Sequence, residues 1–491
     1  MVASEVAPFA KTGGLADVVG SLPAALDALG HDVTVVTPRY RRVPIDGAAP
    51  HRRRVWLGRA AHDVELHTRP LSERRRVMLL DYPAFYDRDD LYGSGGRDFA
   101  DNAERFALLA VAALDVGQAA AAGVPRPTLI HAHDWQAGLA LSWLRHDPRR
   151  WPDLAPAGTV QTIHNLAYQG LFPREIVPRL GLPWEVLAIE AGEFWGQFSF
   201  LKAGITAADV ITTVSPTYAR ETLTPPFGAG LDGVLRSRAD RYVGILNGID
   251  TTIWNPAADR FLPASYDAQD LSGKAVCKRA LLERFALPIG DDARARPVVG
   301  LVSRLVEQKG LDLIEAAAEA LIATGATFIF VGTGEPRYEG FLRQLAVRHP
   351  SRVGTFIGFD EPLAHLVEAG ADMFLMPSKF EPCGLNQMYS LRYGTVPIVH
   401  AVGGLEDTIQ PYTSRALRAN GFKFRGNSAE ELARVVKQAV RLFADQPTWR
   451  RLLVNGMGDD HSWRQSAREY VKVYRRARVE GAQRGSPAAG A

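Results

Sequence analysis

Two lysine-containing loops of this chain are well suited to bind an anion. One is KTGGL at residues 11–15, and the other is SRLVEQKG at residues 303–310, which carries Arg304 and Lys309. Each loop follows an apolar run typical of a strand and precedes a run typical of a helix. Glycines let the backbone approach a ligand closely, and the N–H groups at a helix N-terminus favour negative charge. We therefore expect both loops to bind one anionic ligand, held between two domains.

Each loop also has a simpler interpretation. KTGGLAD at residues 11–17 is equally compatible with an ordinary strand-to-helix turn that carries a surface lysine. Arg304 and Lys309 are either an incidental pair of surface cations or, as we expect, the groups that neutralise a departing phosphoryl group without a metal ion.

Histidines and an aspartate follow two further strand-like runs. The first run ends in HAHDW at residues 131–135, where His131 and His133 lie on the same side of a regular strand, and the second ends in TIHN at residues 162–165. A metal site made of these histidines and Asp134 is one interpretation. Histidines packed in a core or a polar network are commoner, and we expect no metal. We favour Asp134 and His164 as hydrogen-bond partners for the hydroxyl groups of a polar ligand.

A third group of polar residues surrounds Glu381. This residue lies in MPSKFEPCGLNQ (376–387), between a strand that ends at Met376 and a helix that starts near Gly384. A carboxylate accepts hydrogen bonds from sugar hydroxyls. Cys383 is a less favoured candidate nucleophile, because no histidine lies nearby in sequence to activate it. The pair Gly403-Gly404 also lies between a strand and a helix and can present N–H groups to a phosphate.

The elements that must position these residues alternate between short apolar runs and helix-like stretches, which predicts an α/β fold with parallel sheets. The expected strands of the first half are 32–37, 77–81, 128–133, 159–163, 209–214 and 242–246. Those of the second half are 297–303, 327–332, 353–358, 372–376 and 397–400. Two doubly wound, Rossmann-like halves that face each other across a cleft would place ligands at the carboxyl ends of both sheets.

Three segments depart from this alternation. Only residues 1–4 are available as a strand before the Lys11 loop, whereas a central strand normally takes about five or six residues. We therefore expect a short first strand, or a chain that begins a few residues late. Residues 250–272 lack periodicity and are expected to connect the two halves. The tail at 481–491 is rich in small residues and is expected to be disordered.

Composition restricts the class of protein. A chain of 491 residues is long enough for two or three domains, and its net charge of +3 is too small to indicate nucleic acid as a partner. Two short arginine runs, at 52–54 and 74–76, are expected to lie on a solvated face. The two cysteines lack CxxC spacing, and no run has the length or flanks of a membrane span or a signal peptide. We expect a cytoplasmic protein with no membrane partner.

Eight segments, in this order along the chain, resemble the bacterial glycogen synthases and plant starch synthases. They are KTGGLADV (11–18), DNAERF (101–106), HAHDWQAGL (131–139), TIHNLAYQG (162–170), GILNGID with the following IWNP (244–256), VSRLVEQKGLDL (302–313), PSKFEPCGLNQ (377–387) and GGLEDT (403–408). Single segments are modest evidence, but eight in order across nearly the whole chain are very specific.

The resemblance implies a glycosyltransferase of the GT-B type that transfers glucose from ADP-glucose to the non-reducing end of an α-1,4-glucan such as glycogen. It implies retention of anomeric configuration, with no metal ion and no cofactor. It also implies an acceptor-side domain at 1–248 and a nucleotide-sugar domain at 249–461. A last helix at 462–480 is then expected to pack back on the first domain.

The resemblance also carries roles to individual residues. The expected catalytic residues are Glu381, Arg304, Lys309, Asp134 and His164. The expected substrate-binding residues are Lys11, Gly13, Gly14, Asp17, Tyr92, Asn247, Cys383, Gly384, Leu385, Gly403 and Gly404. Many related transferases have a second glutamate eight residues after the first, where this chain has Tyr389. Asn386 stands where relatives often have threonine, and it keeps the ability to hydrogen-bond.

Three alternative functions remain open at this point. The nearest is a related transferase that uses UDP-glucose or a different acceptor, because the motifs indicate the diphosphate and the hexose better than the base. A catalytically silent glucan-binding protein is the second, although such a protein would not need the diphosphate cations. A phosphorylase-like enzyme is the third, and it would need a lysine for pyridoxal phosphate that no pattern here indicates.

Overall fold

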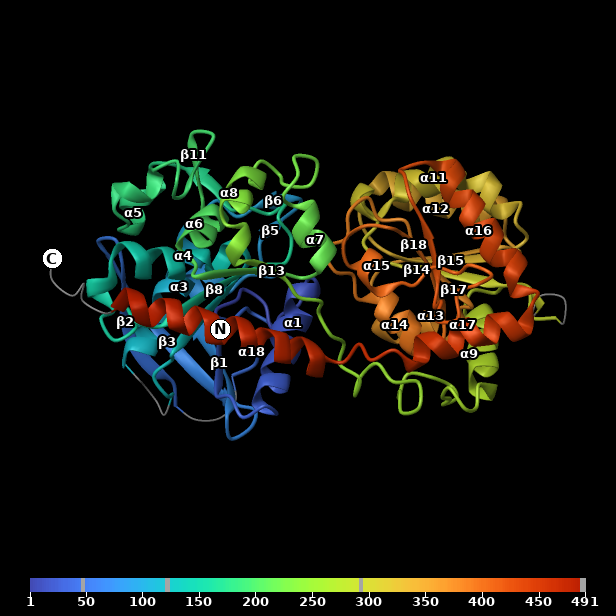
Figure 1. Cartoon of the computed structure of the whole chain (residues 1–491), viewed down its shortest axis with the longest axis horizontal. Coiled ribbons are helices and arrows are strands. Elements are labelled where there is room, and N and C mark those ends of the chain that lie inside the picture. The colour runs from blue at the N-terminus through green and yellow to red at the C-terminus, as the bar shows by residue number, and fades with distance from the viewer. Residues whose placement is uncertain (46–48, 120–123, 291–294, 486–491) are drawn as a thin grey trace. The chain divides into compact units, whose positions relative to one another are not determined.

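The computed structural model describes residues 1–45, 49–119, 124–290 and 295–485, and it divides the chain into two compact units (Figure 1). Unit 1 comprises Met1–Gly248 together with the chain from Trp463 onward, and unit 2 comprises Ile249–Ser462. The buried apolar residues form one cluster in unit 1 and separate clusters in unit 2. Each unit therefore has a hydrophobic core of its own.

The sheet of unit 1 is built from two four-stranded halves. One half has the order β1-β4-β3-β2 and the other β13-β12-β8-β7. The strands are β1 (Val33–Pro38), β2 (His51–Leu57), β3 (Ala60–Pro70), β4 (Arg75–Asp81), β7 (Leu129–His133), β8 (Gly158–Ile163), β12 (Val210–Thr213) and β13 (Tyr242–Gly244). Val2 makes parallel bridges to Val36 of β1 and to Ala132 of β7. The N-terminal residues thus lie between the two halves and join them.

Helices and small sheets surround this sheet in unit 1. The described helices are α1 (Gly14–Asp27), α2 (Pro83–Tyr86), α3 (Asn102–Ala119), α4 (Asp134–His146), α5 (Ile176–Leu180), α6 (Phe200–Ala207), α7 (Pro216–Glu221), α8 (Asp232–Ser237) and α18 (Trp463–Gly485). The small strands are β5 (Gly93–Ser94), β6 (Arg97–Asp98), β9 (Leu171–Pro173), β10 (Glu193–Phe194) and β11 (Gln197–Ser199). Helix α18 packs on β8 and α1, so the last helix completes the unit that contains the N-terminus.

Unit 2 is a doubly wound parallel sheet with the strand order β16-β15-β14-β17-β18-β19. Its strands are β14 (Val298–Val302), β15 (Thr327–Gly332), β16 (Val353–Ile357), β17 (Met373–Met376), β18 (Val396–His400) and β19 (Phe422–Phe424). Its described helices are α9 (Ser272–Arg284), α11 (Leu311–Ile322), α12 (Pro336–Arg348), α13 (Glu361–Gly370), α14 (Asn386–Arg392), α15 (Gly403–Thr408), α16 (Ala429–Phe443) and α17 (Gln446–Gly458). Strands β15, β17 and β18 are buried at every residue, as expected of a parallel sheet covered on both faces.

The expected α/β fold with parallel sheets is confirmed, and each expected strand after the first is present. The sequence reasoning missed β2, β3 and β19 of the main sheets and the small strands β5, β6, β9, β10 and β11. The arginine run at 52–54 lies on β2, where exposed and partly buried side chains alternate instead of forming an apolar run. Strands β2 and β3 form an antiparallel hairpin at the sheet edge, and such strands keep one polar face.

Two expectations about the chain ends need correction. Residues 1–4 make single bridges through Val2 and form no continuous strand. The expected disordered tail at 481–491 begins too early, because α18 continues to Gly485 and Gly481 is buried close to Ala157. Residues 486–491 lie outside the described residues. None of the described helices is long and apolar enough to cross a membrane.

Candidate active site

In unit 1 the carboxylate of Glu5 binds the loop that the sequence predicts to bind an anion. Glu5 is 3% exposed, and its carboxylate accepts hydrogen bonds from Thr12 N (2.5 Å), Gly13 N (3.3 Å) and the Thr12 hydroxyl (2.7 Å). Gly13 is the residue before α1, so this carboxylate lies where a helix N-terminus favours negative charge. Lys11 Nζ in the same loop bonds Asp17 Oδ1 at 2.6 Å, and both side chains are partly exposed.

Tyr92 belongs to the same network. Its hydroxyl lies 2.5 Å from Glu5 Oε1 and 2.8 Å from the Ser4 hydroxyl. Burial, reinforced by the Glu5 charge, raises the pKa of Tyr92 well above its usual value, so the hydroxyl stays a donor. Asn102, from the DNAERF segment, donates to the Tyr92 carbonyl at 2.8 Å. The structure thereby connects Tyr92 to the loop of Lys11 through Glu5.

Asp134 and His164 meet at the carboxyl ends of β7 and β8. Asp134 is the first residue of α4 and has a left-handed backbone with φ of 56°. Its Oδ1 accepts the His164 backbone N–H at 2.7 Å. Burial raises the pKa of the Asp134 carboxyl to about 7, although this hydrogen bond opposes the shift. A neutral carboxyl can donate a hydrogen bond as well as accept one.

The three histidines form a row in which His131 and His133 are buried and His164 is half-buried. His131 and His133 lie on the same side of β7 with ring centroids 4.0 Å apart, as the strand period predicts. His133 Nδ1 lies 3.0 Å from His164 Nε2, whereas the ring nitrogens of His131 contact Tyr474 and Thr162. Burial lowers the pKa of all three, that of His164 to about 3, so they are neutral. His131 is therefore part of a polar network with α18.

Asn247 also comes from unit 1. It lies in the segment that follows β13 and is 6% exposed. Its side-chain Oδ1 is buried and has no hydrogen-bond partner. A buried acceptor without a partner is costly, so this amide is available to a ligand donor.

In unit 2 the central interaction joins Lys309 to Glu381. Lys309 Nζ lies 2.6 Å from Glu381 Oε2, and the two side chains are 19% and 8% exposed. Ser378 Oγ donates to the same carboxylate oxygen at 2.9 Å. Gly310 explains the proximity of the two loops: its φ is 75°, and a Cβ there would lie 2.1 Å from the Pro377 carbonyl oxygen. Only glycine permits this approach.

Arg304 emerges after β14, as expected. Its Nη2 donates to Gln308 Oε1 at 3.3 Å, and Gln308 Nε2 donates to the Phe380 carbonyl at 3.3 Å. Gln308 thus links the guanidinium to the loop of Glu381. The sequence reasoning assigned Arg304 and Lys309 to one site, and the structure places both beside that loop.

The glycine pair at 403–404 packs directly on the Glu381 loop. Gly404 N donates to the Glu381 carbonyl at 3.1 Å, so this N–H holds the loop. A Cβ on Gly403 would lie 2.0 Å from the Glu381 carbonyl oxygen, and one on Gly404 would lie 2.1 Å from the Cys383 carbonyl oxygen. The pair therefore positions the backbone of Glu381 and Cys383, a role that the sequence did not reveal.

The remaining sequence-predicted residues follow Glu381 in the same loop. Cys383 is buried and in no disulfide, Gly384 has φ of 72°, and Leu385 precedes α14. Helix α14 starts at Asn386, two residues later than expected, because Gly384 is left-handed. Asn386 Nδ2 donates to the Val302 carbonyl at 2.6 Å and ties the helix start to β14.

Tyr389 has a packing role where many related transferases have a second glutamate. Its ring stacks on Trp254 at 3.7 Å between centroids, and the opposite partner of Trp254 is His365 at 3.8 Å. Trp254 belongs to the IWNP segment, so a motif without evident chemistry proves to be part of this aromatic stack.

The sequence reasoning missed Glu5, Ser378 and Gln308. Ser378 and Gln308 lie inside segments that were singled out, and Glu5 lies between the expected first strand and the Lys11 loop, yet each seemed ordinary beside charged or glycine neighbours. Glu5 offered one signal, since a carboxylate shortly before a glycine-rich helix start can accept its N–H groups.

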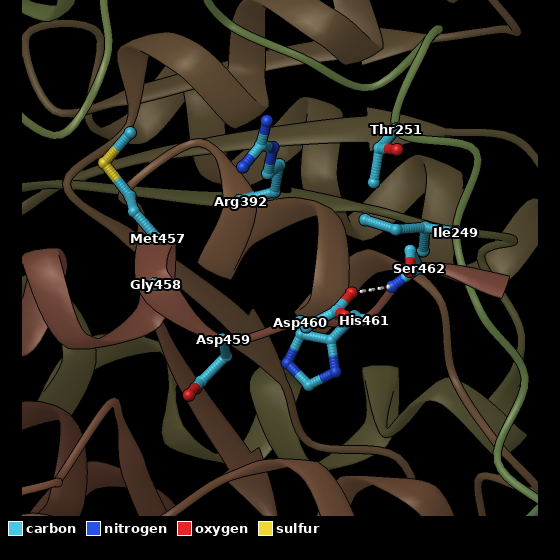
Figure 2. Close-up of a pocket in the computed structure, with 9 residues that line it drawn as sticks. All are labelled: Ile249, Thr251, Arg392, Met457, Gly458, Asp459, Asp460, His461 and Ser462. Atoms are coloured by element: carbon cyan, nitrogen blue, oxygen red, sulfur yellow. Dashed lines mark hydrogen bonds between the residues drawn. The ribbon is translucent and has the colours of Figure 1, made fainter. Parts of the chain in front are cut away.

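A separate pocket of about 270 Å³ lies elsewhere in unit 2 (Figure 2). It is lined by Ile249, Thr251, Arg392 and residues 457–462. None of the expected site residues lines it, so it is not part of the candidate active site.

Comparisons with known proteins cover nearly the whole chain. The family model described as "Starch synthase catalytic domain" matches residues 1–237, and "Glycosyl transferases group 1" matches residues 290–447. The glycogen synthase of Anaeromyxobacter dehalogenans is 52% identical over 96% of this chain and 98% of its own length. The chain belongs to the glycogen and starch synthase family. The glycogen synthase of Myxococcus xanthus is 49% identical over 96% of this chain and 98% of its own length.

Solved structures agree with this family. The catalytic domain of starch synthase IV from Arabidopsis thaliana has a TM-score of 0.88 and 31% identity, and the match covers 97% of this chain and 98% of that one. Sucrose-phosphate synthase from Thermosynechococcus elongatus has a TM-score of 0.56 at 19% identity, over 98% of each chain, and supports the fold alone. As a member of the glycogen and starch synthase family, the chain is a glycosyltransferase with the expected GT-B fold.

Proposed function

We propose that this enzyme transfers glucose from ADP-glucose to the non-reducing end of an α-1,4-glucan, with retention of anomeric configuration, in glycogen biosynthesis. The observation that carries the proposal is the Lys309–Glu381 pair at 2.6 Å, held beside Arg304 at the carboxyl ends of β14 and β17. A similar solved protein, starch synthase IV, is described as bound to ADP and acarbose. Family membership over 96% of the chain supports the same activity.

Unit 2 is proposed to bind the nucleotide sugar. Arg304 and Lys309 would hold the diphosphate, because a guanidinium and an ammonium both form charge-assisted hydrogen bonds with phosphate oxygens. Glu381 would accept hydrogen bonds from hydroxyls of the donor glucose. Cys383, Gly384 and Leu385 would surround that sugar, and the glycine pair at 403–404 would hold the loop in place.

Unit 1 is proposed to supply the acceptor side. Asp134 and His164 would line the glucose-binding surface, with Asn247 close by. Tyr92 would contact the acceptor or the nucleotide. Lys11, Gly13, Gly14 and Asp17 would contact the nucleotide sugar, which requires the ligand to share the helix N-terminus with the Glu5 carboxylate.

The chemistry follows from the charges. Positive charge develops on the glucosyl ring in the transition state, while negative charge builds on the departing ADP. Fixed cations aimed at the leaving group stabilise that state more than the ground state. No enzymic nucleophile is evident among the residues proposed for the site, so we propose front-face attack by the acceptor hydroxyl. The proposed transfer uses no metal ion.

The test is transfer of labelled glucose to glycogen, with ADP-glucose and UDP-glucose in parallel and without added metal. We expect strong incorporation from ADP-glucose. Preference for UDP-glucose would contradict the proposed donor and leave the fold and chemistry in place. No incorporation from either donor would contradict the proposed activity and favour a glucan-binding protein.

A further inference from the structure

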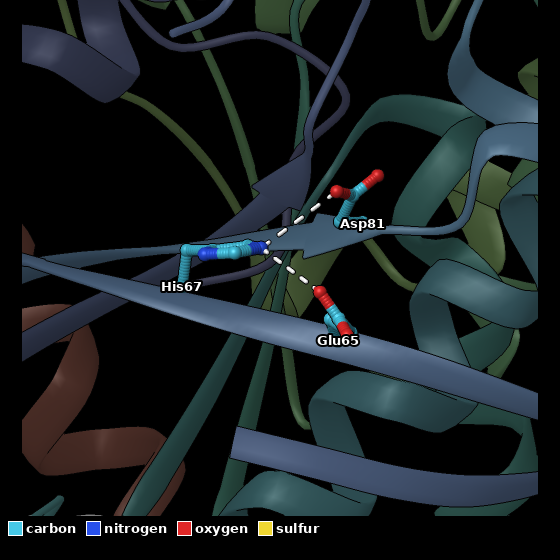
Figure 3. Close-up of side chains that lie close together, drawn as sticks. All are labelled: Glu65, His67 and Asp81. Carbon is cyan, nitrogen blue, oxygen red and sulfur yellow. Dashed lines mark ion pairs between the residues drawn. The ribbon is translucent and has the colours of Figure 1, made fainter. Parts of the chain in front are cut away.

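One imidazole and two carboxylates gather on one face of the β3–β4 pair in unit 1 (Figure 3). Glu65 and His67 are two residues apart on β3 and so share a face. Asp81, the last residue of β4, lies directly opposite Glu65 in the antiparallel register. In the part of the chain that the structure describes, this is the one group of three or more His, Cys, Asp or Glu whose ligand atoms all lie within 4.8 Å of one another.

The imidazole is buried and lacks hydrogen bonds. His67 is 5% exposed, and neither of its ring nitrogens has a hydrogen-bond partner. Its Nε2 is directed at two oxygens, Glu65 Oε2 and Asp81 Oδ2, each 3.7 Å away. This distance is too long for a hydrogen bond, and a buried polar atom without one is costly. The imidazole nitrogen therefore faces both carboxylates without a hydrogen bond to either.

Two arginines orient the carboxylates. Arg39 Nη1 donates to Asp81 Oδ1 at 3.3 Å, and Arg52 Nε donates to Glu65 Oε1 at 3.0 Å. Each carboxylate thus uses one oxygen for an arginine and presents the other to His67. Such outer contacts fix the direction of metal ligands in proteins. Two carboxylates directly opposite each other on neighbouring strands repel, and a cation between their inner oxygens removes that repulsion.

We propose that Glu65, His67 and Asp81 bind one divalent cation of the zinc class. Imidazole nitrogen and carboxylate oxygen are zinc donors, and bonds of about 2.0–2.1 Å to a tetrahedral ion place neighbouring donors roughly 3.4 Å apart. The two distances of 3.7 Å from His67 need only a small adjustment, and all three donor atoms lie within 4.8 Å of one another. Water would complete the coordination. The Glu65 side chain is 36% exposed, which gives the ion a path from solvent.

The ion would connect β3 to β4 and stabilise the sheet edge. It belongs to none of the groups proposed to bind substrate, and glucosyl transfer does not pass through it. The competing explanation is that the three side chains contact only one another and bind no ion. That explanation leaves stability independent of zinc.

The experiment uses the full chain, freed of metal by chelator and then titrated with zinc sulfate. Calorimetry measures the stoichiometry, and thermal unfolding measures stability at each zinc concentration. Cobalt(II), added alone, reports a tetrahedral site through its visible absorption. The variants are His67→Ala and Glu65→Gln, and the control is His62→Ala, whose residue lies on β3 but faces the other side of the sheet.

We expect one zinc ion per chain and a Tm that rises with zinc concentration, because a ligand of the folded state stabilises it. His67→Ala should lose both effects, and His62→Ala should keep them. Glu65→Gln retains the imidazole and the shape of the side chain, so it tests the proposal even if His67→Ala does not fold. Its zinc affinity should fall by about tenfold or more. Absence of zinc-dependent stabilisation in the wild type, or unchanged binding in Glu65→Gln, would overturn the proposal.

Discussion

At the scale of single residues, three buried carboxyl groups organise the candidate active site. Glu5, Asp134 and Glu381 are 3%, 8% and 6% exposed. Burial disfavours a charged carboxylate unless partners compensate. Glu5 and Asp134 accept backbone N–H groups, whereas Glu381 has an ammonium and a hydroxyl. Single substitutions at these groups and their partners should therefore have large and specific effects.

Replacing Lys309 by alanine should lower the transfer rate on the order of a hundredfold or more, because one fixed cation at the leaving group is lost. The variant should stay folded, since the unit 2 core does not include this side chain. Steady-state transfer from ADP-glucose, with circular dichroism as the folding check, measures both. Lys437→Ala removes an exposed lysine of α16 and is the matched control, with a normal rate expected. A normal rate in Lys309→Ala would show that this lysine has no role in the reaction.

Asp134 should make stability depend on pH. The pKa of its carboxyl is about 7 in the folded state, against the ordinary aspartate value of 3.8 in the unfolded state, so the folded state keeps a proton that the unfolded state releases. The contribution of Asp134 to the free energy of unfolding is fully present below about pH 4, and it is lost as the pH rises through about 7. The total change is roughly 4 kcal/mol. Asp134→Asn should therefore gain Tm relative to wild type between pH 5 and pH 8.

Asparagine suits this position because it tolerates the left-handed backbone and still accepts the His164 N–H. The control is Asp240→Asn, which changes an exposed aspartate of the same unit. Its Tm difference from wild type should not vary with pH. A constant difference for Asp134→Asn as well would show that the Asp134 carboxyl is ionised throughout this range.

At the scale of elements, close backbone approaches decide where the site residues lie. Gly310, Gly403 and Gly404 each bring one loop onto the backbone of another in unit 2. In unit 1 a glycine likewise lets α18 pack closely on the sheet. Gly158, the first residue of β8, would place a Cβ 2.5 Å from the carbonyl carbon of Ala477. This contact holds the helix that carries Tyr474 against His131.

Gly158→Ala should destabilise unit 1 by about 1–3 kcal/mol, because the backbone of α18 must move away from β8. Urea unfolding with unchanged slope would measure the loss. Gly233→Ala on α8 is the matched control: its Cβ would meet nothing closer than 3.8 Å, and alanine is the better helix former. Equal stability of Gly158→Ala and wild type would mean that α18 does not pack closely on Gly158.

At the scale of the whole molecule, each unit has its own core, but unit 1 is discontinuous in sequence. Its core includes Trp463, Tyr470, Val473 and Ala477 of α18. Unit 2 is one continuous segment whose buried clusters contain no residue of α18. Helix α18 is therefore required to complete the core of unit 1.

A chain that ends at Ser462 should lose stability in unit 1 alone. Removing α18 exposes the apolar surface of β8 and α1 that it covers, whereas unit 2 keeps all its buried contacts. Hydrogen exchange resolved by peptide should show lost protection in β7, β8 and β12 with unchanged protection in β14–β18. The full chain is the control and should show protection in both units. Equal loss in both units would contradict their independence.

The sequence by itself determined the parallel strands and the loops that carry the candidate residues. Buried parallel strands are continuous apolar runs, and functional residues follow them at their carboxyl ends, so local pattern is sufficient. The edge hairpin of β2 and β3 was not predicted, because its strands alternate polar and apolar side chains. Its register, and hence the group of Glu65, His67 and Asp81, depends on strand pairing.

Only the tertiary structure decided which distant groups meet. Glu5 caps the loop of Lys11 and bonds Tyr92 across 87 positions, and Lys309 meets Glu381 across 72. Such contacts depend on strand order and on how closely glycine lets two backbones approach. Neither is encoded in the periodicity of a single segment, because both arise from the packing of segments against one another.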